Sequence, residues 1–330
     1  GFRVGESPSS FTLLRNVSLM PYTIHFAPLQ GYTDSVYREA HAQVFGGVEA
    51  YYTPFVRLER EGFRNKELRD IAPEGNLSAP VVPQLIASSP EEFRRIATLF
   101  RERGYRRADI NMGCPFPMQA RLLRGAGILP YPDEAKKMLE TICEFPDIRF
   151  SVKLRLGWDS VDEAQALLPF LNELPLTHLT LHPRIGTQQY KGATDEDAFS
   201  RFYNLCIHPL FYNGDIHTLA DIHSITARFP RLKGVMLGRG LLAFPWLAAE
   251  YSSGVSLSVQ EKKDKLHAFH ALLLESYSSR LEGGEHQVLD KIKTVWDYLL
   301  PDAEKKLRKK VLKSTRLAAY MEAVKAMIEG

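Results

Sequence analysis

One cysteine of the sequence lies where a thiol could react. Cys114 stands in the string NMGCPFPMQ, Asn111 to Gln119, between a glycine and a proline that would hold it on a rigid turn. Free cysteines are usually buried small hydrophobic residues, and we interpret Cys143 and Cys206 in that way. The setting of Cys114 instead predicts a nucleophile or a proton donor.

Basic side chains at a spacing of two residues occur in two later strings. SVKLRLG carries Lys153 and Arg155, and LHPRIG carries His182 and Arg184. Residues two apart in a strand lie on the same face of the sheet. A charge at the end of an apolar strand is costly unless it meets an anion, an electron-rich ring or an opposite charge. The pattern therefore indicates an anionic ligand, and a salt bridge at the rim of the fold is the alternative.

Three glycine-containing strings could hold a flat or phosphorylated ligand. In YNGDI, residues 212–216, and LGRG, residues 237–240, the glycines leave backbone N–H groups accessible to phosphate oxygens, and Arg239 adds a guanidinium. The third string, APLQGYTD, has a proline and a glycine where a flat ligand could approach the backbone. Taken alone, the string more readily indicates a tight turn followed by Thr33 or Asp34 as a helix cap.

These strings follow short apolar runs that are typical of buried strands. Eight such runs occur in the first 250 residues, and amphipathic segments separate most of them. Eight β/α units in about 230 residues match a TIM barrel, whose active site lies at the carboxyl ends of its strands. A doubly wound sheet would need a glycine-rich dinucleotide fingerprint after the first strand, and QGYTDSVYR is not one. The predicted strands are Ile24–Leu29, Val48–Tyr52, Val81–Ile86, Ala108–Ile110, Phe150–Leu154, Thr177–Leu181, Leu210–Tyr212 and Val235–Leu237.

Amphipathic periodicity predicts helices between the strands and a helical region after them. Acidic residues open the segment Pro90–Phe100, as the helix dipole favours. Beyond about Leu257 no strand-like run appears. We therefore expect an α/β fold, with a TIM barrel over residues 21–250 and a small all-helical domain over residues 255–330. The other predicted helices are Asp133–Glu144, Val161–Leu171, Gln260–Ser278, Gln287–Leu299 and Ala303–Met327.

The composition is that of an ordinary globular protein. The 330 residues are 45% hydrophobic and 25% charged, with a formal net charge of +3. No run of about 18 apolar residues predicts a membrane span, and no secretory signal precedes Met20. Three cysteines without a paired spacing argue against disulfides and a zinc site, which predicts a reducing cytoplasm. Residues 1–20 are interpreted as an N-terminal extension, part of which could derive from cloning.

In their order along the chain, several strings resemble the dihydrouridine synthase family over residues 22–250. They are APLQGYTD, VPQL, NMGCP, KLRLG, HPR, NGDI and GRG, and NMGCP is the most diagnostic of them. The resemblance implies a flavin-dependent enzyme with bound FMN that reduces uridines in transfer RNA (tRNA) to 5,6-dihydrouridine, with NADPH as the reductant. It assigns the cofactor to Pro28, Leu29, Gln30, Gln84, Lys153, His182, Asn213, Gly214, Asp215, Gly238 and Arg239.

The resemblance also implies a mechanism. Reduced FMN would give a hydride to uracil C6, and Cys114 would protonate C5 as general acid. Asn111 and Arg184 are expected to contact the substrate. One departure is the segment HPRIGTQQYKG, where the family more often has HGR followed by a TR pair. Pro183 removes a backbone donor there, and residues 185–192 are expected to bear on substrate choice.

Basic residues outside these strings could bind the RNA backbone. The segment Lys305–Arg316 carries seven basic residues and no acid, which predicts either an RNA-binding patch or a solvated helix face. A second basic cluster, Arg101, Arg103, Arg106 and Arg107, could instead complement a helix dipole. The target base must leave its stack to reach a flavin. The expected partners are tRNA and NADPH, without metal or membrane, and a monomer is favoured.

Two other functions fit parts of this pattern. A flavin oxidoreductase acting on a free pyrimidine, as dihydroorotate-type dehydrogenases do, would share the barrel but would not need the basic helical segment. A non-catalytic RNA-binding protein with a degenerate barrel is less consistent with an intact Cys114 and Lys153. A metal-dependent aldolase-type barrel would need a set of His, Asp and Glu ligands that these strings lack.

Overall fold

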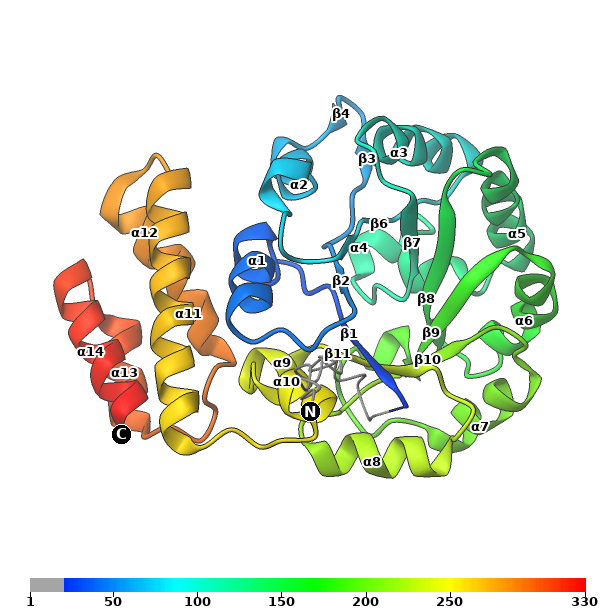
Figure 1. Ribbon diagram of the computed structural model, residues 1–330. Helices are drawn as coiled ribbons and strands as arrows, with labels where there is room; N and C mark the ends of the chain where they lie inside the picture. The colour runs from blue at the N-terminus through cyan, green and yellow to red at the C-terminus, as the bar shows by residue number, and fades with distance from the viewer. Residues whose placement is uncertain (1–20) are drawn as a thin grey trace, which may run out of the picture.

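A closed ring of parallel strands forms the centre of the protein (Figure 1). The structure is a computed structural model that describes residues 21–330, so the predicted N-terminal extension lies outside the described residues. The sheet order is β5-β2-β1-β11-β10-β9-β8-β7-β6. The strands are β1 (Thr23–Phe26), β2 (Ala50–Tyr52), β5 (Val81–Val82), β6 (Gln84–Leu85), β7 (Arg107–Met112), β8 (Arg149–Gly157), β9 (Leu176–Ile185), β10 (Leu210–Asn213) and β11 (Gly234–Leu237).

The ring closes at the third predicted strand, Val81–Ile86. Pro83 divides this run into β5 and β6, because proline has no N–H to donate to a neighbouring strand. β5 pairs with β2, and β6 pairs with β7. The two pieces together occupy one position of an eight-membered barrel, so the predicted TIM barrel is confirmed. A short antiparallel hairpin, β3 (Leu58–Glu59) and β4 (Gly62–Phe63), was not predicted.

Helices surround the barrel and bury their apolar faces on it. α3 (Pro90–Glu102) shows why they form where they do: Ser89 accepts a hydrogen bond from the backbone N–H of Glu92, and proline opens the first turn. Phe93, Ile96, Ala97 and Phe100 then repeat at helical spacing and are fully buried. The other helices around the barrel are α1 (Ser35–Val44), α2 (Asn65–Asp70), α4 (Pro117–Ala120), α5 (Pro132–Glu140), α6 (Glu163–Glu173), α7 (Glu196–Leu205), α8 (Leu219–Arg228), α9 (Arg239–Ala243) and α10 (Leu247–Ser253).

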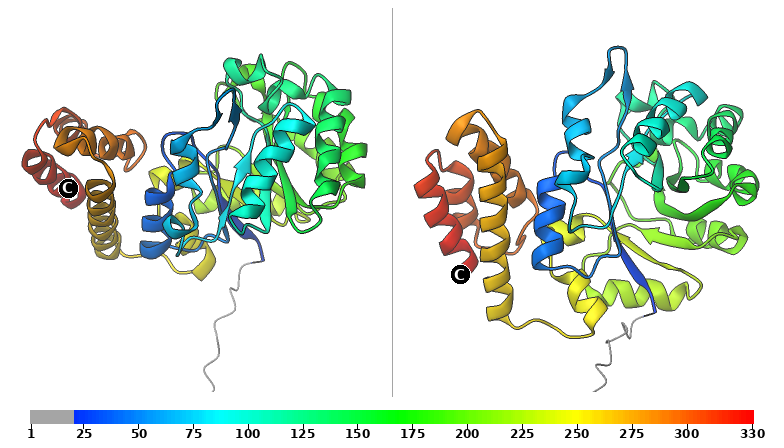
Figure 2. Two further views of the ribbon diagram at one scale, coloured as in Figure 1. Left: turned by 90° about the horizontal axis from the view of Figure 1, so that it is seen from above. Right: turned by 45° about the horizontal axis from the view of Figure 1, so that its top comes forward.

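A helical region of four α-helices follows the barrel and lies beside α1 in every view (Figure 2). It consists of α11 (Val259–Arg280), α12 (Gly284–Lys293), α13 (Lys305–Lys313) and α14 (Leu317–Glu329). Its core includes Tyr320, whose hydroxyl lies 2.9 Å from both Trp296 Nε1 and His270 Nε2. Phe269 of α11 packs edge-on against Tyr37 and Phe45 on the barrel side. No helix among residues 21–330 is long and apolar enough to span a membrane.

The predicted helix Ala303–Met327 is wrong as a single element. Ser314 and Arg316 adopt extended backbone and separate α13 from α14. The break allows α13 to bury Val311, while α14 turns Tyr320, Val324 and other apolar residues into the core. Two further predicted helices end in 3-10 turns, at Thr141–Glu144 and Thr294–Asp297; the remaining 3-10 helices are Pro73–Gly75, Gly125–Ile128 and Gly186–Gln188.

Candidate active site

A cavity opens at the carboxyl ends of the barrel strands, where a TIM barrel is expected to carry its chemistry. Its empty volume is about 1160 Å³, part of which is open solvent. Every candidate site residue except Arg184 lines it. These residues are Pro28, Leu29 and Gln30 after β1, Gln84 on β6, Asn111 and Cys114 from β7, Lys153 on β8, His182 on β9, Asn213, Gly214 and Asp215 from β10, and Gly238 and Arg239 after β11.

Cys114 follows β7 directly and is buried. Its backbone N–H donates to Asn111 Oδ1 over 2.8 Å, and the N–H of Gly113 donates to the same oxygen over 3.0 Å. Gly125 is required beside it, because a Cβ at that position would lie 2.7 Å from Cys114 Cβ. Burial raises the pKa of the Cys114 thiol above its ordinary value. The site therefore holds a protonated thiol at neutral pH, which suits a proton donor.

A chain of buried hydrogen bonds extends from Cys114 into the barrel. Asn111 Nδ2 donates to Gln84 Oε1 over 2.8 Å, and Gln84 Nε2 donates to Asp109 Oδ2 over 2.7 Å. The hydroxyl of Ser151 donates to Asp109 Oδ1 over 2.6 Å. Burial raises the pKa of Asp109 to about 7, although the bonds from Ser151 and Gln84 oppose that shift. Asp109 was not predicted from the sequence. An acidic residue in the middle of an apolar strand could have indicated it.

Lys153 and Arg155 lie on β8 with their side chains toward the cavity. Among residues 21–330, no carboxylate lies within ion-pair distance of either side chain, so the salt-bridge alternative is wrong for this pair. Arg155 instead donates to the carbonyls of Ile185 and Gln189 over 3.1 and 2.5 Å. Burial, followed by the charge of Arg155, lowers the pKa of Lys153 to about 8. The carboxylate of Asp109 opposes this shift only in part, so an anionic ligand in the cavity would stabilise the ammonium.

The salt-bridge interpretation applies to Arg184 instead. Arg184 is 2% exposed and lies outside the cavity lining. Its guanidinium pairs with both carboxylate oxygens of Asp215 and donates to the carbonyl of Gly192 and to His182 Nε2. Asp215 also pairs with Arg239 over 2.9 Å. Although burial opposes ionisation, the bond from Arg184 keeps the pKa of Asp215 below its ordinary value.

His182 and two glycines line another part of the cavity. Burial, followed by the charges of Arg155, Lys153 and other cations, lowers the pKa of His182 well below 6.5, so the imidazole is neutral. Gly214 has a φ of +150°, and a Cβ there would lie 3.0 Å from Thr194. A Cβ on Gly238 would lie 3.3 Å from Leu29. Glycine at both places therefore keeps the space beside the strand ends free for a ligand.

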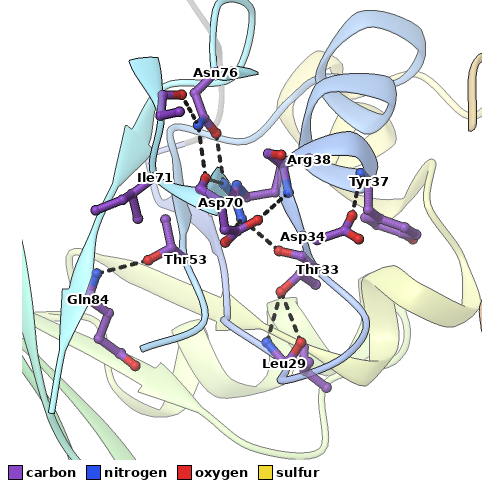
Figure 3. A network of polar contacts seen from close by, with 12 residues as sticks. Leu29, Thr33, Asp34, Tyr37, Arg38, Thr53, Asp70, Ile71, Asn76 and Gln84 are labelled. Carbon is purple, nitrogen blue, oxygen red and sulfur yellow. Dashed lines mark hydrogen bonds and ion pairs between the residues drawn. The ribbon is translucent and has the colours of Figure 1, made fainter. Parts of the chain in front are cut away.

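The string APLQGYTD lines the cavity with its first part and caps a helix with its last residue. The first part of the string lines the cavity, and Asp34 caps α1 by accepting from the backbone N–H of Tyr37 over 3.0 Å (Figure 3). Thr33 Oγ1 accepts from the N–H of Leu29 over 2.9 Å and closes the turn between them.

Aromatic side chains at the cavity were not among the predicted site residues. The ring of Tyr190 contacts the guanidinium groups of both Arg155 and Arg239, which lie 5.3 and 4.8 Å from its centre. It falls within residues 185–192, the segment expected to bear on substrate choice. Tyr298 reaches the cavity from the helical region, and no local sequence signal indicated this. No group of His, Cys, Asp and Glu among the described residues could hold a metal ion.

Solved structures share the barrel. Morphinone reductase in complex with tetrahydroNAD superposes with a TM-score of 0.52 at 13% identity, over 76% of this chain and 92% of that one. The old yellow enzyme from Trypanosoma cruzi gives a TM-score of 0.50 at 13% identity, over 74% of this chain and 93% of that one. At such identities the likeness concerns the fold alone.

Sequence relatives are more specific. The tRNA-dihydrouridine(16) synthase of Pseudomonas putida is 29% identical over 70% of this chain and 73% of its own length. The tRNA-dihydrouridine synthase B of Pasteurella multocida is 24% identical over 68% of this chain and 67% of its own. The family model described as dihydrouridine synthase matches residues 25–327, a range that includes both the barrel and the helical region. With that match across nearly all described residues, the chain belongs to the dihydrouridine synthase family.

Proposed function

We propose that the protein reduces the C5–C6 double bond of particular uridines in tRNA, with FMN as its bound cofactor and NADPH as the reductant. Family membership supports this reaction, and tRNA is named as the substrate of the relatives. One observation carries the proposal: the buried thiol of Cys114, whose pKa is raised, opens into the same cavity as the ammonium of Lys153, which has no carboxylate within ion-pair distance among the described residues. A cytoplasmic location and a monomeric state are further predictions.

The residues of the cavity fit FMN. Lys153 would face the electron-rich side of the flavin ring, and the neutral His182 with the bare backbones of Gly214 and Gly238 would receive the phosphate end. Gln84 already uses one donor on Asp109 and its carbonyl oxygen on Asn111, so its second N–H is the group left for the ring edge. When bound, FMN would accept a hydride from NADPH and pass it to uracil C6.

Cys114 would supply the proton that the reaction consumes. The thiol gives its hydrogen to uracil C5 as general acid and becomes a thiolate, which recovers a proton from solvent before the next turnover. Arg155 and Lys153 lie close enough to favour that thiolate electrostatically. Asn111 fixes the backbone of Cys114 and would contact the uracil. Arg184 was predicted as a substrate contact but is paired with Asp215 instead. We propose that it holds the side chains of His182 and Asp215 in position.

We propose that the exposed lysines of α13 bind the RNA backbone. Six of the seven basic residues between Lys305 and Arg316 are exposed. Arg308 is the exception, because its guanidinium donates to the carbonyls of Trp296, Leu299 and Leu300 and thereby fixes α13 to the preceding turn. In the second basic cluster Arg103 binds the carbonyl of Leu68. The patch on α13 is therefore the better candidate for the RNA backbone.

The test is formation of dihydrouridine in tRNA that lacks the modification, with NADPH present, measured by nucleoside mass spectrometry. We expect product with the native protein and nearly none with Cys114→Ala. Cys206→Ala is the matched control, because Cys206 is equally buried but lies outside the cavity. Product from Cys114→Ala at the native rate would remove the assigned acid. No product from a native protein that binds flavin would reject the substrate and favour a free pyrimidine.

A further inference from the structure

The loop after β1 has two parts with different neighbours. Ala27–Gln30, the cavity segment, lines the proposed flavin site. In Gly31–Ser35, the docking loop, Tyr32 also lines the cavity, and Gly31, Tyr32 and Asp34 contact the helical region. The two parts are tied together at Leu29. Its backbone carbonyl accepts from the N–H groups of Tyr32 and Thr33 over 3.0 and 3.1 Å, and its N–H donates to Thr33 Oγ1. A displacement of the docking loop would therefore move the cavity segment with it.

The barrel side holds this loop through one buried arginine. Arg38 is 1% exposed, and its Nη1 donates to the carbonyl of Thr33 over 2.8 Å and to Asp70 Oδ2 over 3.0 Å. Its Nη2 donates to the carbonyl of Asp70 and to Asn76 Oδ1 over 2.8 and 2.7 Å (Figure 3). The guanidinium is thus shared between the docking loop, the last residue of α2 and the segment after α2.

The helical region holds the same loop from the other side. The hydroxyl of Tyr277, on α11, donates to the two carboxylate oxygens of Asp34 at 2.9 and 3.1 Å. Lys291, on α12, reaches Asp34 Oδ2 and the carbonyl of Gly31, each at 3.0 Å. Tyr277 is 3% exposed, whereas the Asp34 side chain is 23% exposed, so water reaches the contact only from the side of the carboxylate.

The helical region also completes the cavity wall. Tyr32 of the docking loop donates to Asp297 over 3.1 Å, and its ring packs edge-on against Tyr298 with centroids 5.0 Å apart. Tyr298 itself lines the cavity. The site is therefore built from both parts of the chain. The docking loop joins them next to the cavity, whereas the packing of α11 on α1 joins them farther away.

We infer that Asp34 is a positioning residue through which the helical region holds the cavity segment in place. The inference rests on the proposed function in one respect only: the held segment would be the one that binds flavin. The helical region then has two roles. It is proposed to bind the RNA, and it also positions the cavity segment of the site that acts on that RNA.

The experiment compares two variants that release the docking loop with one that does not. Tyr277→Phe removes the hydroxyl from Asp34, and Lys291→Met removes the ammonium from Asp34 and Gly31. Lys265→Met is the matched control: Lys265 Nζ donates to the carbonyl of Val44 over 2.6 Å, so it also joins the helical region to the barrel, but at the far end of α1. The first readout is amide hydrogen exchange of residues 27–35 in the cofactor-free protein. The second is the dissociation constant of FMN, followed by flavin fluorescence.

We expect exchange in residues 27–35 to be about tenfold faster in Tyr277→Phe and Lys291→Met than in the native protein. Their FMN affinity should fall roughly 3- to 10-fold. Lys265→Met should leave both quantities unchanged, although its melting temperature falls with theirs. Native exchange and native FMN affinity in all three variants would overturn the inference. If the native protein binds no FMN, the proposed function fails, and the exchange data still decide whether Asp34 holds the loop.

Discussion

The Asn111 side chain bridges the proposed acid and the proposed flavin contact. Its oxygen accepts from the backbone N–H of Cys114 over 2.8 Å, and its nitrogen donates to Gln84 over 2.8 Å. One amide thus fixes the thiol relative to the group expected at the flavin ring. An amide is needed for this, because only a side chain with both an acceptor and a donor can serve both neighbours.

Asn111→Ala should therefore slow the chemical step more than it weakens tRNA binding. We expect single-turnover formation of dihydrouridine to fall by about 10- to 100-fold at saturating tRNA, because small misplacements of a reacting group are costly. Ser151→Ala is the comparison, since Ser151 lies further along the same chain of hydrogen bonds, beyond Asp109. A smaller loss is expected there. Equal losses would mean that the whole chain, rather than Asn111, positions Cys114.

Because the proposed FMN contact Lys153 has a lowered pKa, we expect FMN binding to weaken in alkaline solution. Burial lowers its pKa to about 8 in the cofactor-free protein. Only the ammonium form attracts an anionic ligand, so FMN affinity should be full below that value and fall as the pH rises through it. The dissociation constant measured between about pH 6.5 and 9.5 checks this. Lys153→Met should bind FMN weakly at every pH; an unchanged slope in that variant would assign the titration to another group.

The barrel could be predicted from the sequence because its signals are local. Eight apolar runs at regular intervals and polar strings after them indicate both the fold and the edge of the sheet where the strings meet. How the ring closes was harder to predict from the sequence. Pro83 splits one apolar run into β5 and β6, and these two strands pair with different neighbours, β2 and β7. The break between α13 and α14 depends on which apolar residues reach the core, and periodicity alone does not show that.

The site could be predicted only as far as strand position determines it. His182 and Arg184 share a face of β9, yet one lines the cavity and the other is turned into an ion pair with Asp215. The spacing of two residues identifies the face of the strand on which both side chains lie. The partner of Arg184, however, lies in the loop after β10, which is distant in sequence. Tyr298 is the extreme case: it joins the cavity from the helical region, more than 250 residues after the docking loop it packs against. Only the folded arrangement brings these residues together.

Asp215 should contribute strongly to stability. It is the counter-charge of Arg184, which is 2% exposed, so Asp215→Asn leaves a buried guanidinium without a carboxylate. We expect the free energy of unfolding in urea to fall by about 2 kcal/mol, less than for a fully buried pair because the Asp215 side chain is 38% exposed. Because the pKa of Asp215 lies below its ordinary value, this stabilisation is present at neutral pH and is lost as the pH falls through the folded-state pKa.

Glu196→Gln provides the contrast for that measurement. Glu196 pairs with Arg228, whose side chain is half exposed, and such surface pairs contribute less than about 1 kcal/mol. A similar small loss for Asp215→Asn would show that water or another group satisfies Arg184.

The lysines of α13 should determine affinity for RNA without affecting the flavin. Lys306, Lys310 and Lys313 are exposed and recur at helical spacing, so one strand of RNA backbone could contact all three. Replacing them with glutamine should weaken tRNA binding and reduce the slope of log Kd against log salt concentration by about 2 to 3, because each lysine that neutralises a phosphate contributes nearly one to that slope. Filter binding at several salt concentrations measures both effects.

A second triple variant separates local contacts from total charge. Lys66, Lys137 and Lys233 are also exposed, but they lie on the barrel rather than on α13. Their replacement with glutamine changes the net charge equally, and we expect it to leave the salt slope nearly native. FMN affinity should be native in both sets. If both sets weakened tRNA binding to the same degree, the attraction would come from the overall charge of the protein, and the α13 patch would lose its assigned role.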